Sequence, residues 1–388
     1  MKRGIYMRFF HLSDLHIGKH LHHYNLKEDQ QHILGEIVAY AKEIHPDAIV
    51  LAGDIYDKSV PSAEAVTIFD DFLTELSQIE PEIPVLVISG NHDSPERLQY
   101  VSGILSRYHI HMAGSVPRTK EEYLKKISFT DAYGKVNFYL LPFMKPSYVR
   151  NVSDEVPELY TDAVKMILDR EEIDFSERNV LVSHQFYTNG GQKPEICDSE
   201  IISVGGIDNV DIEAVEEFDY VALGHIHGSQ KVGKSYIRYC GTPLKYSVSE
   251  SNHEKYLTLV TLREKGEEPE ITKLPLHPLH DVKKLKGKLA DILEQSVKEG
   301  GQDYVSITLT DEVESYRPKE QLENVYERIL EIRVDNTRTR NKLMETEEEK
   351  ILLNPLEAFA GFFEEMQGRG LSEEELIYMQ KIFEQKEE

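Results

Sequence analysis

The sequence has little cysteine and no long apolar segment, and each absence excludes a class of protein. Cys197 and Cys240 are the two cysteines among 388 residues, too few for a disulfide framework or a cysteine-rich zinc module. The longest apolar runs, such as 48–52 and 85–88, are far shorter than the roughly 20 residues of a membrane-spanning helix. Residues 1–7 show no secretory signal pattern. We therefore expect a cytoplasmic chain without a membrane partner.

Basic residues are also scarce relative to acidic ones. The chain carries 44 Lys and Arg against 69 Asp and Glu, a formal net charge of −25. A charge of this sign repels another polyanion at long range. A role on nucleic acid would therefore need bound metal, local basic clusters or a basic partner.

The first two thirds of the chain alternate short β-branched apolar runs with longer stretches of helical period. This pattern is typical of a layered α/β domain. Strands are expected at residues 8–12, 48–51, 85–89, 137–142, 180–183 and 220–223. Helices are expected between them at residues 28–44, 62–76, 95–107 and 158–171. A charged turn at 264–270, with Pro275 and Pro278 after it, places the end of this first domain at residue 275.

Two smaller regions are expected after this boundary. Residues 276–340 predict an α/β unit with helices near 281–298 and 318–330 and strands at 304–309 and 331–334. Residues 341–388 begin with an acidic spacer at 345–349. Two short amphipathic helices follow, one with Asn354 as N-cap and Pro355 in first position, the other opening with a Ser372–Glu375 capping box. Their apolar residues must pack on another surface, in this chain or in a partner: Leu356, Phe359, Phe362, Phe363, Met366, Leu376, Met379 and Phe383.

Five predicted strands of the first domain run directly into polar residues that can bind a metal. Because the carboxyl ends of the strands form the ligand crevice of an open α/β sheet, these segments should converge. The expected ligands are Asp14, His16, Asp54, Asn91, His184, His225 and His227. Each segment alone would be an ordinary cap or turn, so the prediction depends on their combination.

The donor set indicates two divalent ions. Four imidazoles, two carboxylates and one amide oxygen suit Mn²⁺, Fe²⁺ or Zn²⁺ better than Mg²⁺ or Ca²⁺. Seven ligands overfill one tetrahedral site, whereas a bridging carboxylate lets two ions share them. Asp54, the lone carboxylate of its segment, is the expected bridge.

Residues 228–235 match the phosphate-binding pattern Gly-x4-Gly-Lys-Ser. That mechanism needs a helix after the loop, but the β-rich run 236–240 follows it here. We therefore predict a hairpin turn at this position and no nucleotide site.

The order of the metal segments resembles the calcineurin-like metallophosphoesterases from residue 7 to about residue 275. Within that superfamily, residues 14–19, 91–98 and 239–244 are similar to SbcD-type exonuclease subunits, although the six residues before Met7 depart from the pattern. The resemblance implies a DNA nuclease of repair and recombination. It also implies ATP-dependent double-strand exonuclease and single-strand endonuclease activity beside an SbcC-type coiled-coil ATPase, in a heterotetramer that contains a homodimer of this chain.

The resemblance also implies roles for particular residues. The first metal would be held by Asp14, His16, Asp54 and His227, and the second by Asp54, Asn91, His184 and His225, with Mn²⁺ the expected ion. His92, paired with Asp93, would stabilise the transition state and assist the leaving oxygen. Lys19 and Arg97 would contact phosphate, although a structural ion pair is an equal alternative for Arg97.

By the same resemblance, residues 276–340 would cap the nuclease and position DNA, and the terminal helices would bind the ATPase. The basic cluster at Lys283, Lys284, Lys286 and Lys288 could equally be a solvated face. The main rival is a stand-alone phosphatase or small-molecule phosphodiesterase on the same scaffold, which the capping and tail regions argue against. A second rival is a non-enzymatic assembly scaffold with a relic site, which the complete ligand set argues against.

Overall fold

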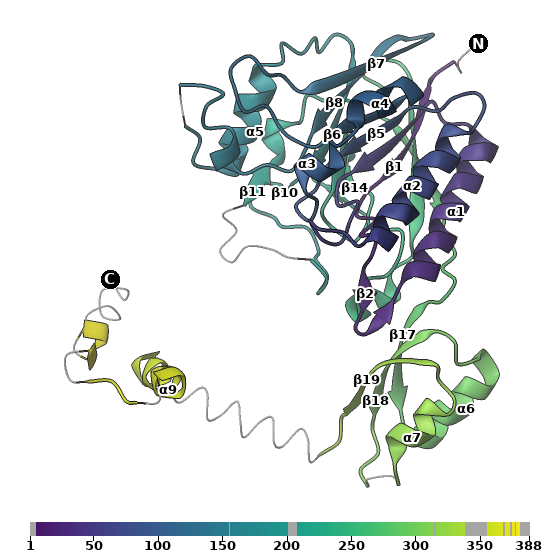
Figure 1. Cartoon of the computed structure of the whole chain (residues 1–388), viewed down its shortest axis with the longest axis vertical. Coiled ribbons are helices and arrows are strands. Elements are labelled where there is room, and N and C mark those ends of the chain that lie inside the picture. Colours follow the sequence, from purple (N-terminus) through teal and green to yellow (C-terminus); the bar gives the residue numbers. More distant parts are fainter. Residues whose placement is uncertain are drawn as a thin grey trace. The chain divides into compact units, whose positions relative to one another are not determined.

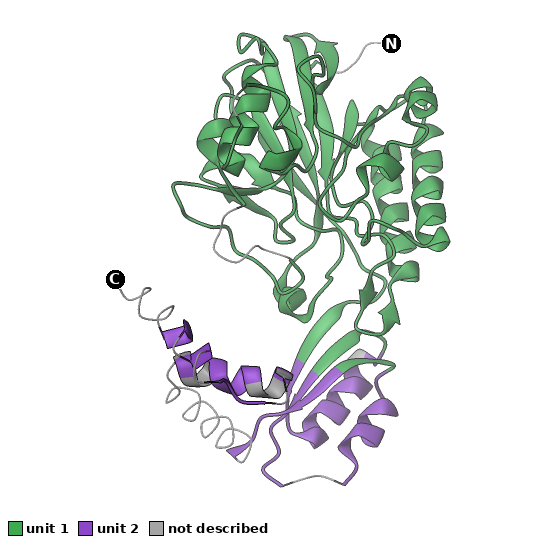
Figure 2. Ribbon diagram, turned by 60° about the vertical axis from the view of Figure 1, so that its left-hand side comes forward, with its two compact units in different colours: residues 1–284, 302–306, 327–330 green, residues 285–301, 307–326, 331–388 purple. Residues whose placement is uncertain are grey.

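A computed structural model describes residues 5–154, 156–200, 208–313, 316–337, 355–367, 369–372, 375–376 and 378–380. The chain divides into two compact units (Figure 2). The first comprises residues 1–284, 302–306 and 327–330, and the second comprises residues 285–301, 307–326 and 331–388. The division into three domains predicted from the sequence stays a prediction. The acidic spacer at 345–349, Asn354 and Phe383 lie outside the described residues.

The first unit is built on two six-stranded sheets. One has the order β16-β15-β1-β4-β5-β6. Its strands are β1 (Met7–Leu12), β4 (Ala48–Ala52), β5 (Val85–Ile88), β6 (Ile110–Ala113), β15 (Tyr256–Leu262) and β16 (Glu270–Pro275). The strands β1, β4, β5 and β6 are parallel, and the hairpin of β15 and β16 pairs antiparallel with β1.

The second sheet has the order β13-β14-β12-β9-β8-β7. Its strands are β7 (Lys125–Asp131), β8 (Gly134–Leu141), β9 (Arg178–His184), β12 (Tyr220–Gly224), β13 (Gln230–Val232) and β14 (Lys234–Tyr239). The four central strands are parallel, and the two edge strands are antiparallel. Two short pairs lie outside these sheets: β2 (His20–Leu21) with β3 (Tyr24–Asn25), and β10 (Phe186–Thr188) with β11 (Asn209–Asp211).

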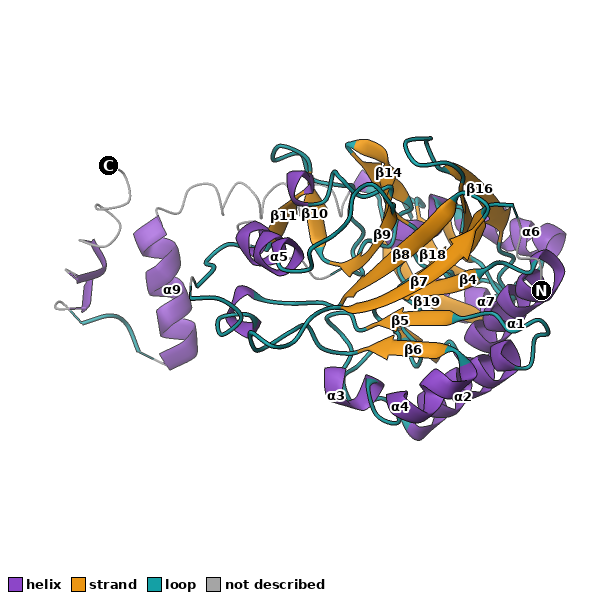
Figure 3. Ribbon diagram, turned by 90° about the horizontal axis from the view of Figure 1, so that it is seen from above, coloured by secondary structure: helices purple, strands orange, loops and turns teal. Residues whose placement is uncertain are grey.

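Helices cover the outer faces of the two sheets, as Figures 1 and 3 show for α1 (Lys27–Ile44), α2 (Ala63–Ser77) and α5 (Tyr160–Asp169). Successive side chains of β4 point to opposite faces of its sheet, so the strand contributes to two different layers of the core. Ile49 and Leu51 pack in the cluster that includes α1 and α2, whereas Val50 packs in the cluster between the sheets. The first unit is therefore an α/β sandwich of four layers, which confirms the predicted fold class.

The strands expected from the sequence are all present, but three expected helices differ. Residues 95–107 form α3 (Pro95–Leu98), α4 (Ser102–Leu105) and a 3₁₀ turn at Ser106–Tyr108, because Val101 adopts a left-handed φ of 55°. The start of the segment 281–298 is the strand β17 (Val282–Gly287), and α6 (Leu289–Glu299) begins after it. The end of the segment 318–330 also belongs to a strand, because α7 stops at Glu323 (Pro318–Glu323). Further 3₁₀ turns are Pro146–Tyr148, Ile212–Ala214 and Val248–Asn252.

The strands β17, β18 (Tyr304–Leu309) and β19 (Arg328–Val334) form a three-stranded sheet, and α9 (Pro355–Gln367) lies in the second unit. The capping box is confirmed, because Ser372 N donates to Glu375 Oε2 at 2.9 Å and Glu375 N donates to Ser372 Oγ at 3.4 Å. The predicted hairpin is also confirmed, with β13 and β14 paired antiparallel about Gly233. Within the described residues, no helix is both long and apolar enough to cross a membrane.

Candidate metal centre

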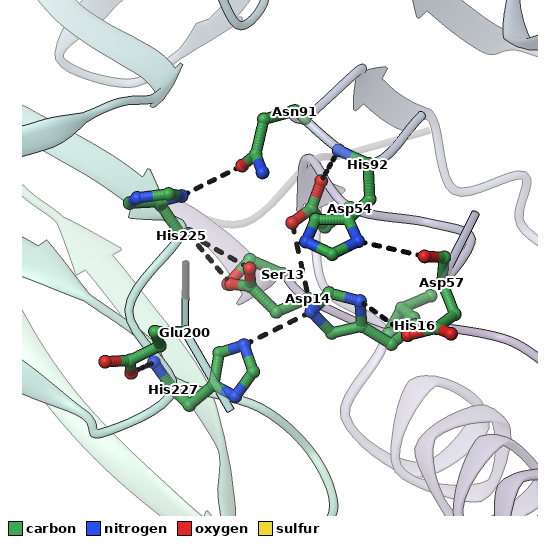
Figure 4. Close-up of polar contacts among 12 residues, drawn as sticks. Ser13, Asp14, His16, Asp54, Asp57, Asn91, His92, Glu200, His225 and His227 are labelled. Atoms are coloured by element: carbon green, nitrogen blue, oxygen red, sulfur yellow. Dashed lines mark hydrogen bonds and ion pairs between the residues drawn. The ribbon is translucent and has the colours of Figure 1, made fainter. Parts of the chain in front are cut away.

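The structure brings the seven expected ligands together at the carboxyl ends of five strands. Figure 4 labels all of them except His184. Two follow β1, one follows β4, one follows β5, one ends β9 and two follow β12. Six are buried and Asn91 is partly exposed. The convergence is a consequence of topology, because β1, β4 and β5 are parallel neighbours in one sheet and β9 and β12 in the other.

One group of donors lies around His16. Donor atoms of Asp14, His16 and His227 all lie within 4.8 Å of one another. His16 Nε2 is 3.2 Å from His227 Nε2 and 3.8 Å from Asp54 Oδ2. In Figure 4 the His16 ring lies between these two side chains.

A second group lies around His184. Donor atoms of Asp14, Asp54 and His184 also lie within 4.8 Å of one another. His184 Nε2 is 3.3 Å from Asp54 Oδ2 and 3.1 Å from Asn91 Oδ1, which is 2.9 Å from His225 Nδ1. The carboxylate of Asp54 therefore faces both groups, the position that a bridging ligand requires.

The donor atoms fit divalent cations. His184 Nδ1 donates to Ala52 O at 2.8 Å, so in the neutral ring the lone pair is on Nε2, the nitrogen that faces Asp54. Two neutral imidazoles with their Nε2 atoms 3.2 Å apart, as in His16 and His227, can direct both lone pairs at a common cation. His16 Nδ1 is buried and makes no hydrogen bond within the described residues.

The backbone is strained at the same positions. Asp14, His16, Asp54 and His225 have φ values of 52°, 43°, 50° and 106°, a region that residues other than glycine seldom adopt. Such strain costs on the order of 1–3 kcal/mol per residue and clusters at functional sites. Gly90 must stay without a side chain, because a Cβ there would lie 2.1 Å from Asp54 Oδ1.

The pKa values of the buried histidines and of Asp54 are shifted by burial and by their charged neighbours. Burial lowers the pKa of His16, and burial together with the charge of His184 lowers that of His225 to about 3, so both rings are neutral with lone pairs available. Burial opposes a charge on His184 too, but the carboxylates of Asp54 and Asp14 outweigh it and raise the pKa of His184 to about 9. Burial likewise opposes ionisation of Asp54, yet His184 and the neighbouring imidazoles lower its pKa. A bound cation would take the place of the proton that His184 holds.

His92 has a different partner from the one expected. Its Nδ1 donates to Asp57 O at 2.9 Å and its backbone N–H donates to Asp54 Oδ1 at 2.8 Å. The carboxylate of Asp93 instead accepts the backbone N–H groups of Gly90, Ile55 and Tyr56 at 2.9–3.1 Å. Asp93 thus ties the loop after β4 to the loop after β5. Burial and the charge of Asp54 raise the pKa of Asp93 to about 6.

The two expected phosphate contacts differ in their surroundings. Lys19 Nζ lies 2.8 Å from Asp57 Oδ1, so its charge is already paired beside the donor groups. Arg97 is exposed on α3 and lies outside the donor groups.

Sequence reasoning missed Asp57 and Glu200. Asp57 Oδ1 is 3.7 Å from His16 Nδ1, and Glu200 Oε1 accepts the backbone N–H of His227. Asp57 could have been found as a second carboxylate three residues after Asp54, whereas no spacing points to Glu200.

Two families match the sequence. Residues 7–229 match the family described as calcineurin-like phosphoesterase. Residues 277–367 match one described as type 5 capsule protein repressor C-terminal domain.

Curated relatives cover most of the chain. The D subunit of the SbcCD nuclease from Staphylococcus epidermidis is 33% identical over 329 residues, 84% of each chain. The protein of the same name from Staphylococcus saprophyticus is 30% identical over 295 residues, 75% of each chain. A solved dimetal phosphatase from Danio rerio aligns with 70% of this chain and 99% of its own, with 14% identity and a TM-score of 0.39. The chain belongs to the calcineurin-like phosphoesterases, a family of metal-dependent hydrolases, and within them to the SbcD subunits.

Proposed function

We propose that this chain is a two-metal DNA nuclease subunit that hydrolyses phosphodiester bonds at DNA ends and hairpins in repair and recombination. One observation carries the proposal: two groups of buried nitrogen and oxygen donors share the carboxylate of Asp54. Asp14, His16, Asp54 and His227 would hold one ion, and Asp54, Asn91, His184 and His225 the other. The mixture of imidazole and carboxylate donors favours Mn²⁺ over Mg²⁺.

Divalent ions held in such a pair supply an activated water at neutral pH and neutralise charge on the phosphoryl oxygens. The chain itself supplies orientation and a proton. His92 Nδ1 donates to Asp57 O, which leaves Nε2 to face the leaving oxygen. In the doubly protonated ring, Nε2 would carry the proton that the leaving oxygen takes, and the ring would return to its neutral form. Asp93 supports this role indirectly, by fixing the loop that carries His92. Lys19 and Arg97 remain our proposed phosphate contacts.

The proposed partner is an SbcC-type coiled-coil ATPase, which would provide ATP-dependent double-strand exonuclease and single-strand endonuclease activity. The net charge of −25 opposes DNA binding by the chain alone, and the Gly-x4-Gly-Lys-Ser segment is a β-hairpin. The relatives are named as one lettered component of a nuclease, which supports a second kind of subunit.

We also propose that the chain forms a homodimer through the apolar surface of residues 95–108, the segment that contains α3, α4 and the 3₁₀ turn after them. Tyr100, Ile104 and Tyr108 are 60–74% exposed there. They adjoin a hollow of about 350 Å³ whose lining includes Phe69, Leu73 and Met112. Exposed apolar surfaces of this kind mark sites of protein–protein contact, and a second copy of the chain is the partner that we propose here.

The test is digestion of linear duplex and hairpin DNA in Mn²⁺ by the wild-type chain and by Asp54→Asn, each with and without the ATPase. We expect metal-dependent cleavage by the wild type, and its loss in Asp54→Asn because the shared carboxylate is removed. Cleavage by Asp54→Asn at the wild-type rate would contradict the bridging role. Hydrolysis of a small chromogenic phosphate ester without cleavage of DNA would favour the phosphatase alternative.

A further inference from the structure

A buried polar network lies behind His227, on the side of the ring away from the other donors. Its centre is Glu250, in the 3₁₀ turn Val248–Asn252, whose side chain has no exposed surface. Neither the fold nor the seven expected ligands accounts for a carboxylate at this depth. A buried charge is costly unless it is paired, so its neighbours identify its role.

A chain of hydrogen bonds connects Glu250 to His227. Ser199 Oγ lies 2.8 Å from His227 Nδ1, and the same hydroxyl donates to Glu250 Oε1 at 2.8 Å. The direct separation of His227 Nδ1 and Glu250 Oε1 is 3.6 Å. Because the Ser199 hydroxyl donates its hydrogen bond to the carboxylate, its oxygen can accept a hydrogen bond from the Nδ1–H of His227. We call these two hydrogen bonds, from His227 through Ser199 to Glu250, the relay.

Lys255 holds the carboxylate in place. Its Nζ donates to Glu250 Oε2 and Thr242 Oγ1, each at 2.6 Å, and to His227 O at 3.1 Å, so all three of its protons are used. Burial of a carboxylate is costly without an opposite charge, and Lys255 Nζ supplies that charge at 2.6 Å from Glu250 Oε2. The ion pair therefore contacts His227 at its backbone and, through Ser199, at its ring.

We propose that Glu250 is the positioning residue of the metal ligand His227, acting through Ser199. The relay keeps the proton on His227 Nδ1 and leaves the Nε2 lone pair directed at His16, 3.2 Å away. His184 has its distal nitrogen fixed in the same way, by the backbone carbonyl of Ala52. Such outer partners of a ligating histidine change metal affinity by about 10–100-fold when removed. The inference rests on the proposed metal centre.

The first experiment is calorimetric titration of the metal-free full chain with Mn²⁺. We expect Ser199→Ala to weaken binding of one ion by about 10–100-fold while the chain stays folded, and Ser199→Thr to restore it. Ser247→Ala is the matched control, because Ser247 Oγ also donates to Glu250 Oε1, at 3.1 Å, but has no part in the relay to His227. Wild-type affinity in Ser199→Ala, or equal losses in Ser199→Ala and Ser247→Ala, would overturn the proposal.

A second experiment needs no metal. Long-range ¹H–¹⁵N NMR of the histidine-labelled metal-free chain reports which ring nitrogen of His227 carries the proton. We expect the Nδ1–H tautomer in the wild type and a mixture of tautomers in Ser199→Ala and Glu250→Gln. An unchanged Nδ1–H signal in both variants would refute the relay. If the wild type binds no Mn²⁺, the proposed nuclease centre fails, while the tautomer measurement still decides the role of Glu250.

Discussion

At the scale of single residues, His11 couples stability to pH. It is fully buried between the sheets, where Nδ1 lies 3.0 Å from Tyr220 OH and Nε2 3.2 Å from Leu223 O, and burial lowers its pKa to about 3. An unfolded histidine has a pKa of about 6.5. Between these values the unfolded state binds a proton that the folded state does not, so the free energy of unfolding falls as pH falls.

We expect the stability of the wild type relative to His11→Gln to decrease by roughly 1.7 kcal/mol between pH 6.5 and 5.0, with a slope that rises from about 0.7 kcal/mol per pH unit at pH 6.5 towards about 1.4 kcal/mol at lower pH. Urea unfolding of both proteins in EDTA measures this difference, and all other titrating groups cancel in the comparison. Stability curves that run parallel from pH 7.5 to 5.0 would show that His11 does not titrate as its burial requires.

His92 allows metal binding and proton donation to be separated. We expect His92→Gln to reduce cleavage of hairpin DNA by about 100- to 10,000-fold, because the leaving oxygen loses its proton donor. Metal content should not change, because His92 is outside the seven proposed ligands. Activity assays combined with metal analysis of the same preparations provide the test.

His22→Gln is the control for His92, because His22 is an exposed histidine in the turn between β2 and β3 and its replacement should leave cleavage unchanged. A loss of bound metal in His92→Gln would contradict our assignment. It would point instead to the donor group of His16, Asp57 and His92, whose atoms also lie within 4.8 Å of one another.

At the scale of secondary structure elements, two glycines of the same domain should respond oppositely to alanine. Gly35 is exposed in the interior of α1, and a Cβ added there would meet nothing within 4 Å, so Gly35→Ala should raise stability by about 0.5–1 kcal/mol. At Gly90 the new Cβ would lie 2.4 Å from Asp54 N, so the loops after β4 and β5 must separate.

We expect Gly90→Ala to weaken Mn²⁺ binding and to lower the melting temperature, with Gly35→Ala as the matched substitution. Calorimetric titration and thermal unfolding of both variants supply the measurements. Wild-type metal affinity in Gly90→Ala would mean that the two loops need not be in close contact to form the site.

The elements that could be predicted from the sequence are those whose pattern is set by burial. The central strands β4 and β9 are buried along their whole length and have apolar centres, and α1 and α2 carry one buried stripe each, so their positions follow from the sequence pattern. The helix expected at 95–107 is interrupted at Val101, a left-handed residue that no propensity marks. The strand Val282–Gly287 falls in a segment expected to be helical, because its two buried residues, Val282 and Leu285, are three positions apart, which is a helical spacing.

The residues of the site also fall into those that could be predicted from the sequence and those that could not. The seven proposed ligands could be identified because each follows a strand end, so local sequence places it at a known edge of the sheet. Ser199 and Glu250 lie in segments without such a signal, and tertiary contact alone brings them to His227. The expected pair of His92 and Asp93 failed for a related reason: sequence neighbours need not face each other, and these two point to different partners.

At the scale of the whole molecule, the terminal helices are where we expect the ATPase to bind. In α9, Phe362 and Met366 are 60% and 65% exposed although the helix has an apolar stripe. A short helix that leaves two large apolar side chains exposed gains stability by packing them against another surface. Removal of residues 351–388 should therefore abolish co-purification with an SbcC-type ATPase and leave Mn²⁺-dependent hairpin cleavage by the chain itself unchanged.

A pair of substitutions makes the same test without truncation. Phe362→Ser with Met366→Ser removes two apolar contacts from α9, and we expect co-purification to be lost, because a few buried apolar anchors carry most of the energy of an interface. Val297→Ser is the matched control, since Val297 is 83% exposed on α6, outside the terminal helices. Association that survives both the deletion and the double substitution would place the ATPase on another surface, whereas loss of association in Val297→Ser alone would assign it to α6.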